Sequence, residues 1–468
     1  MQSEIKRIHA DLKRKKITCL ALVKSKLAEL KENTHNSVNF LLETYALEKA
    51  AAVDAKIAAG EEIGLLEGIP FGLKDVYMLQ GQPASASSDF LKEYIAPYTA
   101  TAVQKLLDAG AIPIVKENCD AFGHGSSTEN TVFGAAKNAL DTTKVAGGSS
   151  GGSAVNVAKG FTTFSLGGDT GGSIRQPAGY NGVYGLKPTY GRISRYGIMA
   201  YASSTDVVGP IARSLEDIRI IMNTISGRDY HDQSTIDSEE ISESALSDTA
   251  EAKTYKVGYY NNFIDTEALD EGIKTDFVAL LIRLKTSGVE VVPLDFFDTD
   301  TLVSTYYTLA MAETASNLAR LDGTNFGHRL QAENLKEIYA ITRSENFTEE
   351  TKRRIVGGNQ VLSQGHAEEI YLKARSVRDH IVERFTEEFE EVDIVLSPVS
   401  LTPVPTIGEN LKNPLAMYLS DAYTVGFSLG GLPTLTAPVG TVTGIQITGA
   451  MNAEEKVLKF AEFLNSIK

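Results

Sequence analysis

The sequence predicts an α/β fold in which a sheet is packed between helices. From about residue 69, short apolar runs at 69–73 and 112–115 alternate with helical stretches such as 102–109, a texture typical of this class. Strand-like runs at 257–260 and 289–293 also flank a long helical stretch, 267–286, and so predict a βαβ unit with parallel strands. With 468 residues and 43% hydrophobic content, the chain can bury a large core.

The remaining elements follow in chain order. Residues 2–58 carry apolar residues at helical spacing and predict helices. Ser214 is a suitable N-cap for a helix over 215–225. Residues 228–252 are acidic and serine-rich, which predicts an exposed loop that could serve as a domain linker. A helix over 366–390 then leads into a strand at 393–396 and a proline-rich loop.

Composition narrows the function classes. The 45 Lys and Arg residues against 60 Asp and Glu give a net charge of −15, which opposes a broad nucleic-acid surface. Cys19 and Cys119 match no metal spacing and suit a reducing compartment, and we expect no bound metal. The charged N-terminus lacks a signal-peptide pattern and no apolar run approaches membrane-spanning length, so we expect a cytoplasmic protein without a membrane segment.

A glycine-rich segment is the main candidate for chemistry. Residues 147–172 hold nine glycines in 26 positions, far above the chain's 40 in 468. Its strings are GGSSGGSAV (147–155) and GGDTGGSIRQPA (167–178). Glycines interleaved with hydroxyl groups allow backbone N–H groups to point at an anion or an oxyanion.

Three other interpretations of these strings remain open from the residues alone. A phosphate-binding loop is one, although neither G-x-G-x-x-G nor G-x-x-x-x-G-K-[ST] occurs in the chain. A nucleophile elbow at Gly147, Ser149 and Gly151 would make Ser149 the nucleophile, but the preceding residues 139–144 are mostly polar where that motif needs a strand. The third is a flexible structural loop.

Residues 147–178 resemble, without a gap, the signature of the amidase signature family, and the resemblance extends from about 69 to 449. It includes the family's lysine motif at 72–75 (GLKD). The resemblance implies a Ser/cis-Ser/Lys triad in which Lys74 is the base, Ser149 the relay after a cis peptide bond, and Ser173 the nucleophile. Backbone N–H groups of an oxyanion hole are implied at three further residues, Thr170, Gly171 and Gly172.

The resemblance also implies one compound domain with a mixed central sheet sandwiched between helices. Residues 1–60 would form an N-terminal helical segment packed on a catalytic domain over 61–468. Chemically, the lysine can accept a proton near neutral pH only if it is uncharged, and burial favours that form. We therefore expect Lys74 to be largely buried.

Within the family, residues 187–197, 201–214 and 306–323 are most similar to the A subunits of glutamyl-tRNA(Gln) amidotransferases. This implies a glutamine pocket formed by Tyr306, beside an equally plausible Tyr307, together with Arg354 and Asp421. An arginine fork would bind the α-carboxylate and the aspartate would pair the α-ammonium group.

The same similarity implies two partners in a heterotrimer, a tRNA-binding B subunit and a small C subunit. ATP and Mg would bind only at the partner, with no cofactor in this chain. The sequence departs from the family at Ala121 and His124, where glutamate and methionine are usual, and in the loop at 397–405.

The predicted function is thus a glutaminase subunit that supplies ammonia for the conversion of Glu-tRNA(Gln) to Gln-tRNA(Gln). One alternative is a free-standing amidase acting on another small carboxamide. Another is a non-catalytic scaffold with the same fold, against which the presence of Lys74, Ser149 and Ser173 speaks.

Overall fold

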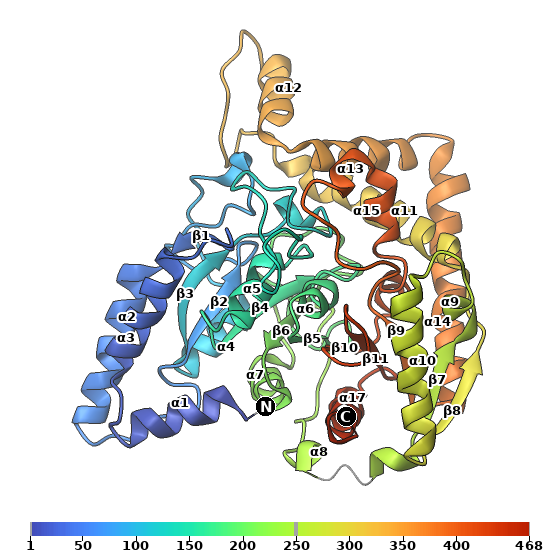
Figure 1. The fold of residues 1–468 in the computed structure, drawn as a ribbon. Helices are drawn as coiled ribbons and strands as arrows, with labels where there is room; N and C mark the ends of the chain where they lie inside the picture. The colour runs from blue at the N-terminus through green and yellow to red at the C-terminus, as the bar shows by residue number, and fades with distance from the viewer. Residues whose placement is uncertain (1, 248–250, 468) are drawn as a thin grey trace.

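The computed structural model describes residues 2–247 and 251–467, and in this part of the chain one sheet organises the molecule (Figure 1). The sheet has eleven strands in the order β1-β3-β2-β4-β6-β5-β10-β11-β9-β7-β8. The strands are β1 (Val38–Leu41), β2 (Pro70–Lys74), β3 (Ile112–Glu117), β4 (Phe164–Asp169), β5 (Tyr184–Lys187), β6 (Val207–Ala212), β7 (Lys256–Tyr260), β8 (Glu290–Leu294), β9 (Ile394–Pro398), β10 (Thr434–Ala437) and β11 (Ile445–Thr448).

The sheet is mixed, as predicted. Strand β2 is parallel to both of its neighbours, β3 and β4, and β7 is parallel to β8 and β9. The pairs between these two groups, and the pair of β1 with β3, are antiparallel. The predicted βαβ unit is confirmed, because β7 and β8 pair in parallel on either side of α10.

Helices pack against this sheet along its whole length (Figure 1). Helices α5 and α6 contact each other and central strands, while α7 and α17 form a second contacting pair. The helices are α1 (Glu4–Lys13), α2 (Cys19–Lys31), α3 (Glu43–Ala58), α4 (Thr101–Asp108), α5 (Gly151–Ala158), α6 (Arg175–Tyr180), α7 (Leu215–Ile225), α8 (Ser244–Ser247), α9 (Asn261–Ile264), α10 (Glu271–Thr286), α11 (Thr299–Asn317), α12 (Leu335–Asn346), α13 (Glu349–Val361), α14 (Leu372–Glu391), α15 (Pro414–Leu419), α16 (Val425–Leu429) and α17 (Glu454–Ser466).

Local signals explain several boundaries. The predicted helix at 215–225 is α7, and the Ser214 side chain accepts a hydrogen bond from the Asp217 N–H, as an N-cap does. The long helix expected from 267 begins at 271 instead, because Asp270 caps it through the N–H groups of Gly272 and Ile273. The helix expected over 366–390 begins with a π-helical segment, Ala367–Tyr371, before α14.

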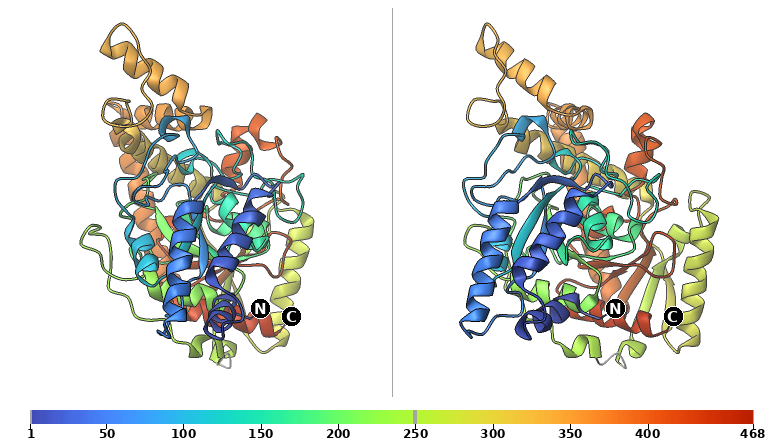
Figure 2. Two further views of the ribbon diagram at one scale, coloured as in Figure 1. Left: turned by 90° about the vertical axis from the view of Figure 1, so that its left-hand side faces the viewer. Right: turned by 60° about the vertical axis from the view of Figure 1, so that its left-hand side comes forward.

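The N-terminal segment contains the expected helices and one unexpected strand. Strand β1 lies between α2 and α3 and pairs antiparallel with β3, so it forms one edge of the sheet. Helix α3 contacts β3, and Figure 2 shows α1–α3 gathered at this end of the molecule. Residues before position 60 therefore contribute to the central sheet as well as covering it.

The segment predicted as an exposed loop, 228–252, is largely irregular but includes α8 and the start of a 3-10 turn, Glu251–Thr254. Its residues 248–250 lie outside the described part of the chain. Among the helices of the described residues, none combines the length and the apolar character that a membrane crossing requires.

Helices α11 and α13 pack closely against each other, and α12 between them in sequence projects from the body (Figures 1 and 2). Helix α11 also contacts α14 and α16. Tyr306 lies on α11 and Arg354 on α13, so this helical layer carries two of the predicted pocket residues.

Candidate active site

Two adjacent parallel strands, β2 and β4, bring the predicted lysine and the second glycine string together at their carboxyl-terminal ends. Lys74 is the last residue of β2, and β4 ends at Asp169, directly before residues 170–173. Leu73 pairs with Leu166, and the rings of Phe71 and Phe164 stack at 5.0 Å between the two strands. Parallel strands place their carboxyl ends together, where α/β proteins commonly bind ligands.

Lys74 and Ser149 are in direct contact. Lys74 Nζ lies 2.7 Å from Ser149 Oγ and also donates to the Gly168 carbonyl oxygen at 3.1 Å. The Gly148–Ser149 peptide bond is cis, as the resemblance implied. Lys74 is 2% exposed, so the expected burial is found.

Burial favours the uncharged form of this lysine. Desolvation lowers the pKa of Lys74 below its ordinary value, although Cys119 and the carboxylates of Asp120, Asp169 and Asp206 act in the opposite direction. The net direction is the one that a lysine base requires.

Ser173 lies beside the Ser149 segment. The Ser150 N–H donates to the Ser173 carbonyl oxygen at 3.1 Å, and Ser150 Oγ donates to the Gly168 carbonyl oxygen at 3.2 Å. These bonds join the turn before α5 to the turn between β4 and α6. Ser173 is 8% exposed.

A buried ion pair braces the turn that carries Ser173. The Asp169 carboxylate accepts from the Ile174 N–H at 3.0 Å and from the Arg175 Nε–H at 3.0 Å. Arg175 Nη2 donates to the second Asp169 oxygen at 3.0 Å, and both side chains are fully buried. The ion pair between Asp169 and Arg175 therefore connects the two sides of the turn formed by residues 170–173.

The three residues predicted for the oxyanion hole are held by close neighbours. Thr170 Oγ1 donates to Asp206 Oδ1 at 2.7 Å. A Cβ on Gly171 would lie 2.5 Å from Tyr306 Cζ, and one on Gly172 would lie 2.5 Å from Thr424 Oγ1. Only glycine fits at both positions, and φ of Gly172 is +148°, a further reason for glycine.

The predicted pocket residues converge on the same turn. Tyr306 packs on Gly171, and its hydroxyl donates to the Tyr201 hydroxyl at 3.4 Å. Tyr307 donates to Asp421 Oδ2 at 2.6 Å, so both tyrosines considered from the sequence line this region. The Arg354 guanidinium lies 5.2 Å from the Tyr307 ring centroid.

Thr424 joins the pocket to the oxyanion turn. Its hydroxyl contacts the Gly171 carbonyl oxygen and donates to the Asp421 carbonyl oxygen at 3.0 Å. Asp421 is 8% exposed, and burial raises the pKa of its carboxyl to about 7, while the Tyr307 hydrogen bond and Arg354 oppose the rise. A cationic ligand group beside this carboxyl would favour its ionised form.

Arg354 is fixed by side chains that the sequence did not single out. Its Nε donates to Glu350 Oε1 at 2.8 Å and its Nη1 contacts the Tyr201 hydroxyl. Nη2 then has no hydrogen-bond partner among residues 2–247 and 251–467, so it is available to an acceptor. The i, i+4 spacing of Glu350 and Arg354 was a usable signal, whereas Tyr201 is brought in only by the fold.

The departures at Ala121 and His124 lie in a turn that approaches Ser149. They belong to a turn that includes the 3-10 segment Ala121–Gly123, and a Cβ on Gly123 would lie 3.7 Å from Ser149 Oγ. The departing loop at 397–405 contributes to a cavity of about 560 Å³ that Ser420, the neighbour of Asp421, also lines.

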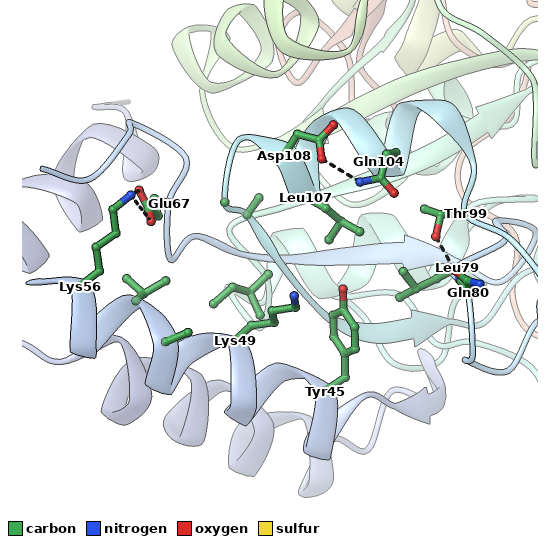
Figure 3. A pocket seen from close by; sticks show the side chains of 15 residues that line it. Tyr45, Lys49, Lys56, Glu67, Leu79, Gln80, Thr99, Gln104, Leu107 and Asp108 are labelled. Atoms are coloured by element: carbon green, nitrogen blue, oxygen red, sulfur yellow. Dashed lines mark hydrogen bonds and ion pairs between the residues drawn. The ribbon is translucent and has the colours of Figure 1, made fainter. Parts of the chain in front are cut away.

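A second groove, of about 530 Å³, is separate from these residues. It lies between α3 and α4, where Lys49 extends beside Tyr45 and Lys56 pairs with Glu67 at 3.0 Å (Figure 3).

No group of three or more His, Cys, Asp or Glu side chains is arranged to hold a metal ion in the described part of the chain.

Comparisons with known proteins identify the family of this chain. The model of the amidase family matches residues 21–458. The A subunit of the glutamyl-tRNA(Gln) amidotransferase from Nostoc sp. is 40% identical over 98% of this chain and 96% of its own length.

Solved structures agree as well. The A subunit of the glutamyl-tRNA(Gln) amidotransferase from Thermotoga maritima matches with a TM-score of 0.73 and 35% identity, covering 86% of this chain and 83% of that chain. A structure described as an amidase matches with a TM-score of 0.80 and 28% identity over 98% of each chain. With the family model spanning nearly the whole sequence, the chain belongs to the amidase family and is an enzyme of that family.

Proposed function

We propose that this chain is the glutaminase subunit of a tRNA-dependent amidotransferase, which converts Glu-tRNA(Gln) to Gln-tRNA(Gln). The observation that carries the proposal is the convergence at one sheet edge of a Lys74–Ser149 contact, the Ser173 turn, and a pocket with one arginine and one aspartate. The similarity to A subunits of such enzymes at about 40% identity supports the same substrate. The catalytic unit includes residues 61–468, and residues 1–60 pack on it and add strand β1 to its sheet.

In the proposed reaction, Ser173 Oγ attacks the carboxamide carbon of glutamine. The Ser173 proton passes to Ser149, whose own proton passes to the neutral Lys74 amine. The negative oxygen of the tetrahedral intermediate accepts hydrogen bonds from backbone N–H groups of residues 170–172, and each such donor typically contributes about 3 to 4 kcal/mol.

The proton then returns along the same path to the leaving nitrogen. The carbon–nitrogen bond breaks, ammonia departs, and the γ-carbonyl of the substrate remains as an ester on Ser173. Water attacks this ester while one of its protons passes into the same relay. The bond between the acyl carbon and Ser173 Oγ then breaks, Oγ takes the proton back from the relay, and the products are glutamate and free Ser173.

Glutamine is selected in this proposal by its two charged α-substituents. Arg354 binds the α-carboxylate through its available Nη2 and Asp421 binds the α-ammonium group, while Tyr306 lies between them and the oxyanion turn. A carboxamide without these groups cannot form either of these two ion pairs, which disfavours its binding relative to glutamine.

The ammonia is used elsewhere. A tRNA-binding B subunit would receive it and would hold ATP and Mg, and a small C subunit would complete a cytoplasmic heterotrimer. The net charge of −15 agrees with tRNA being held by the partner.

Measuring ammonia release from glutamine and from simple carboxamides, with and without co-purifying subunits, tests this function. We expect glutamine turnover that depends on Ser173 and increases with the partner, and Ser173→Ala is the control. Partner-independent turnover of simple amides, with none of glutamine, would favour a free-standing amidase. The similarity to a structure described only as an amidase, at a TM-score of 0.80, is the observation that favours this alternative.

A further inference from the structure

His124 links the turn at 121–124, which approaches Ser149, to α11 and α13, the helices that carry Tyr306 and Arg354. Its ring is fully buried, with Nδ1 lying 3.1 Å from Thr351 Oγ1 on α13 and Nε2 lying 3.3 Å from Thr314 Oγ1 on α11. Its carbonyl oxygen accepts from Asn130 Nδ2 at 2.6 Å, which fixes the backbone. Since both threonines are fully buried, the imidazole satisfies one hydroxyl on each helix.

The same ring packs against the ring of Tyr201. The His124 and Tyr201 rings meet edge to face, with centroids 4.7 Å apart and planes at 84°. Tyr201 in turn touches Arg354 Nη1 and the Tyr306 hydroxyl. The His124 ring is therefore linked through Tyr201 to two of the proposed substrate-binding residues, Arg354 and Tyr306.

The ring is also suited to this place electrostatically. Burial lowers the pKa of His124 well below its ordinary value, and Arg354 acts in the same direction. A neutral imidazole offers one donor and one acceptor, which two threonine hydroxyls can match, and it adds no cation beside the guanidinium.

We propose that His124 is a positioning residue that sets the location of Tyr201 and Arg354, and through them the affinity for the carboxylate end of an amino-acid amide. This deepens the proposed function and rests on it for the identity of the ligand. The residue acts on binding, because its ring packs on Tyr201, which contacts Arg354, whereas the Lys74–Ser149 contact does not involve its ring.

The test compares His124→Leu and His124→Gln with wild type and with His35→Leu. His35 is a second buried histidine, at 7% exposure, outside the site. For His124→Leu we expect KM for glutamine to rise about tenfold with kcat within about twofold, because an interaction equal in ground and transition state is lost. His124→Gln retains a donor and an acceptor and should recover part of the loss, and His35→Leu should leave KM unchanged.

A crystal structure of His124→Leu gives a readout that needs no substrate. We expect Tyr201 and Arg354 to be displaced while Lys74 Nζ and Ser149 Oγ remain 2.7 Å apart. An unchanged Arg354, or a fall in kcat at constant KM, overturns the proposal. If the wild type does not hydrolyse glutamine, the proposed function fails, and the position of Arg354 in the variant still decides the role of His124.

Discussion

Glutamine binding should strengthen as pH rises through about 7, because Asp421 must be ionised to pair the α-ammonium group. Burial raises the pKa of Asp421 to about 7, and a carboxyl is charged above its pKa. At pH 6 about one-eleventh of the groups is ionised and at pH 8 about ten-elevenths, so Kd should fall about tenfold between these values.

Calorimetric titration of glutamine into Ser173→Ala protein isolates this effect, since that variant binds without turnover. The double variant Ser173→Ala with Asp421→Asn should bind weakly and show a flat profile, because no titrating carboxyl remains. In Tyr307→Phe, the lost 2.6 Å hydrogen bond should move the transition to higher pH, since that bond lowers the pKa of Asp421. A Kd for Ser173→Ala that is constant from pH 6 to 8 refutes the role of Asp421.

Three further outcomes are expected. Lys74→Arg should reduce kcat/KM at least about a thousandfold, because arginine stays charged and cannot accept a proton. For the same reason, wild-type kcat/KM should rise with pH as Lys74 loses its proton. Gly171→Ala should lower both substrate affinity and kcat in steady-state assays, since its Cβ would lie 2.5 Å from Tyr306 Cζ. Arg175→Met should lower the free energy of unfolding by about 3 to 5 kcal/mol in denaturant titrations, because it leaves Asp169 buried without its partner.

Each of these changes has a control or a contrary result. Gly64→Ala adds a Cβ whose nearest contact is 4.0 Å away, and it should be silent where Gly171→Ala is not. Substantial turnover by Lys74→Arg would exclude the lysine as the base. If Arg175→Met leaves the free energy of unfolding unchanged, the ion pair between Asp169 and Arg175 contributes little to stability.

The sequence predicted those parts of the fold that local patterns encode. Strands at 69–73 and 112–115, the helix at 215–225 and the βαβ unit all have a length or cap that periodicity can recognise. Strand β1 was missed because it has four residues of intermediate burial between two helices. Strand β6 contains Gly209 and Pro210, residues that local propensity assigns to turns.

For the site, the family resemblance carried by the glycine strings and the GLKD motif implied the candidate triad, and the fold added its surroundings. Tyr201 and His124 come from segments distant from Arg354 and reach its surroundings only through packing of α11, α13 and the turn at 121–124. Their side chains carry no local periodic signal that marks such a meeting. The i, i+4 spacing of Glu350 and Arg354 is common on exposed helices as well.

The hydroxyl of Thr424 touches the carbonyl oxygens of both Gly171 and Asp421, so it joins the residue proposed for substrate recognition to the turn proposed for catalysis. In the proposed mechanism, a change that shifts Asp421 to admit a different nitrogen group would also shift the backbone at Gly171 that is proposed to stabilise the intermediate. Relatives that evolve toward other amides must therefore rebuild the segment around 421–424 as a unit, and single substitutions there should trade turnover for selectivity.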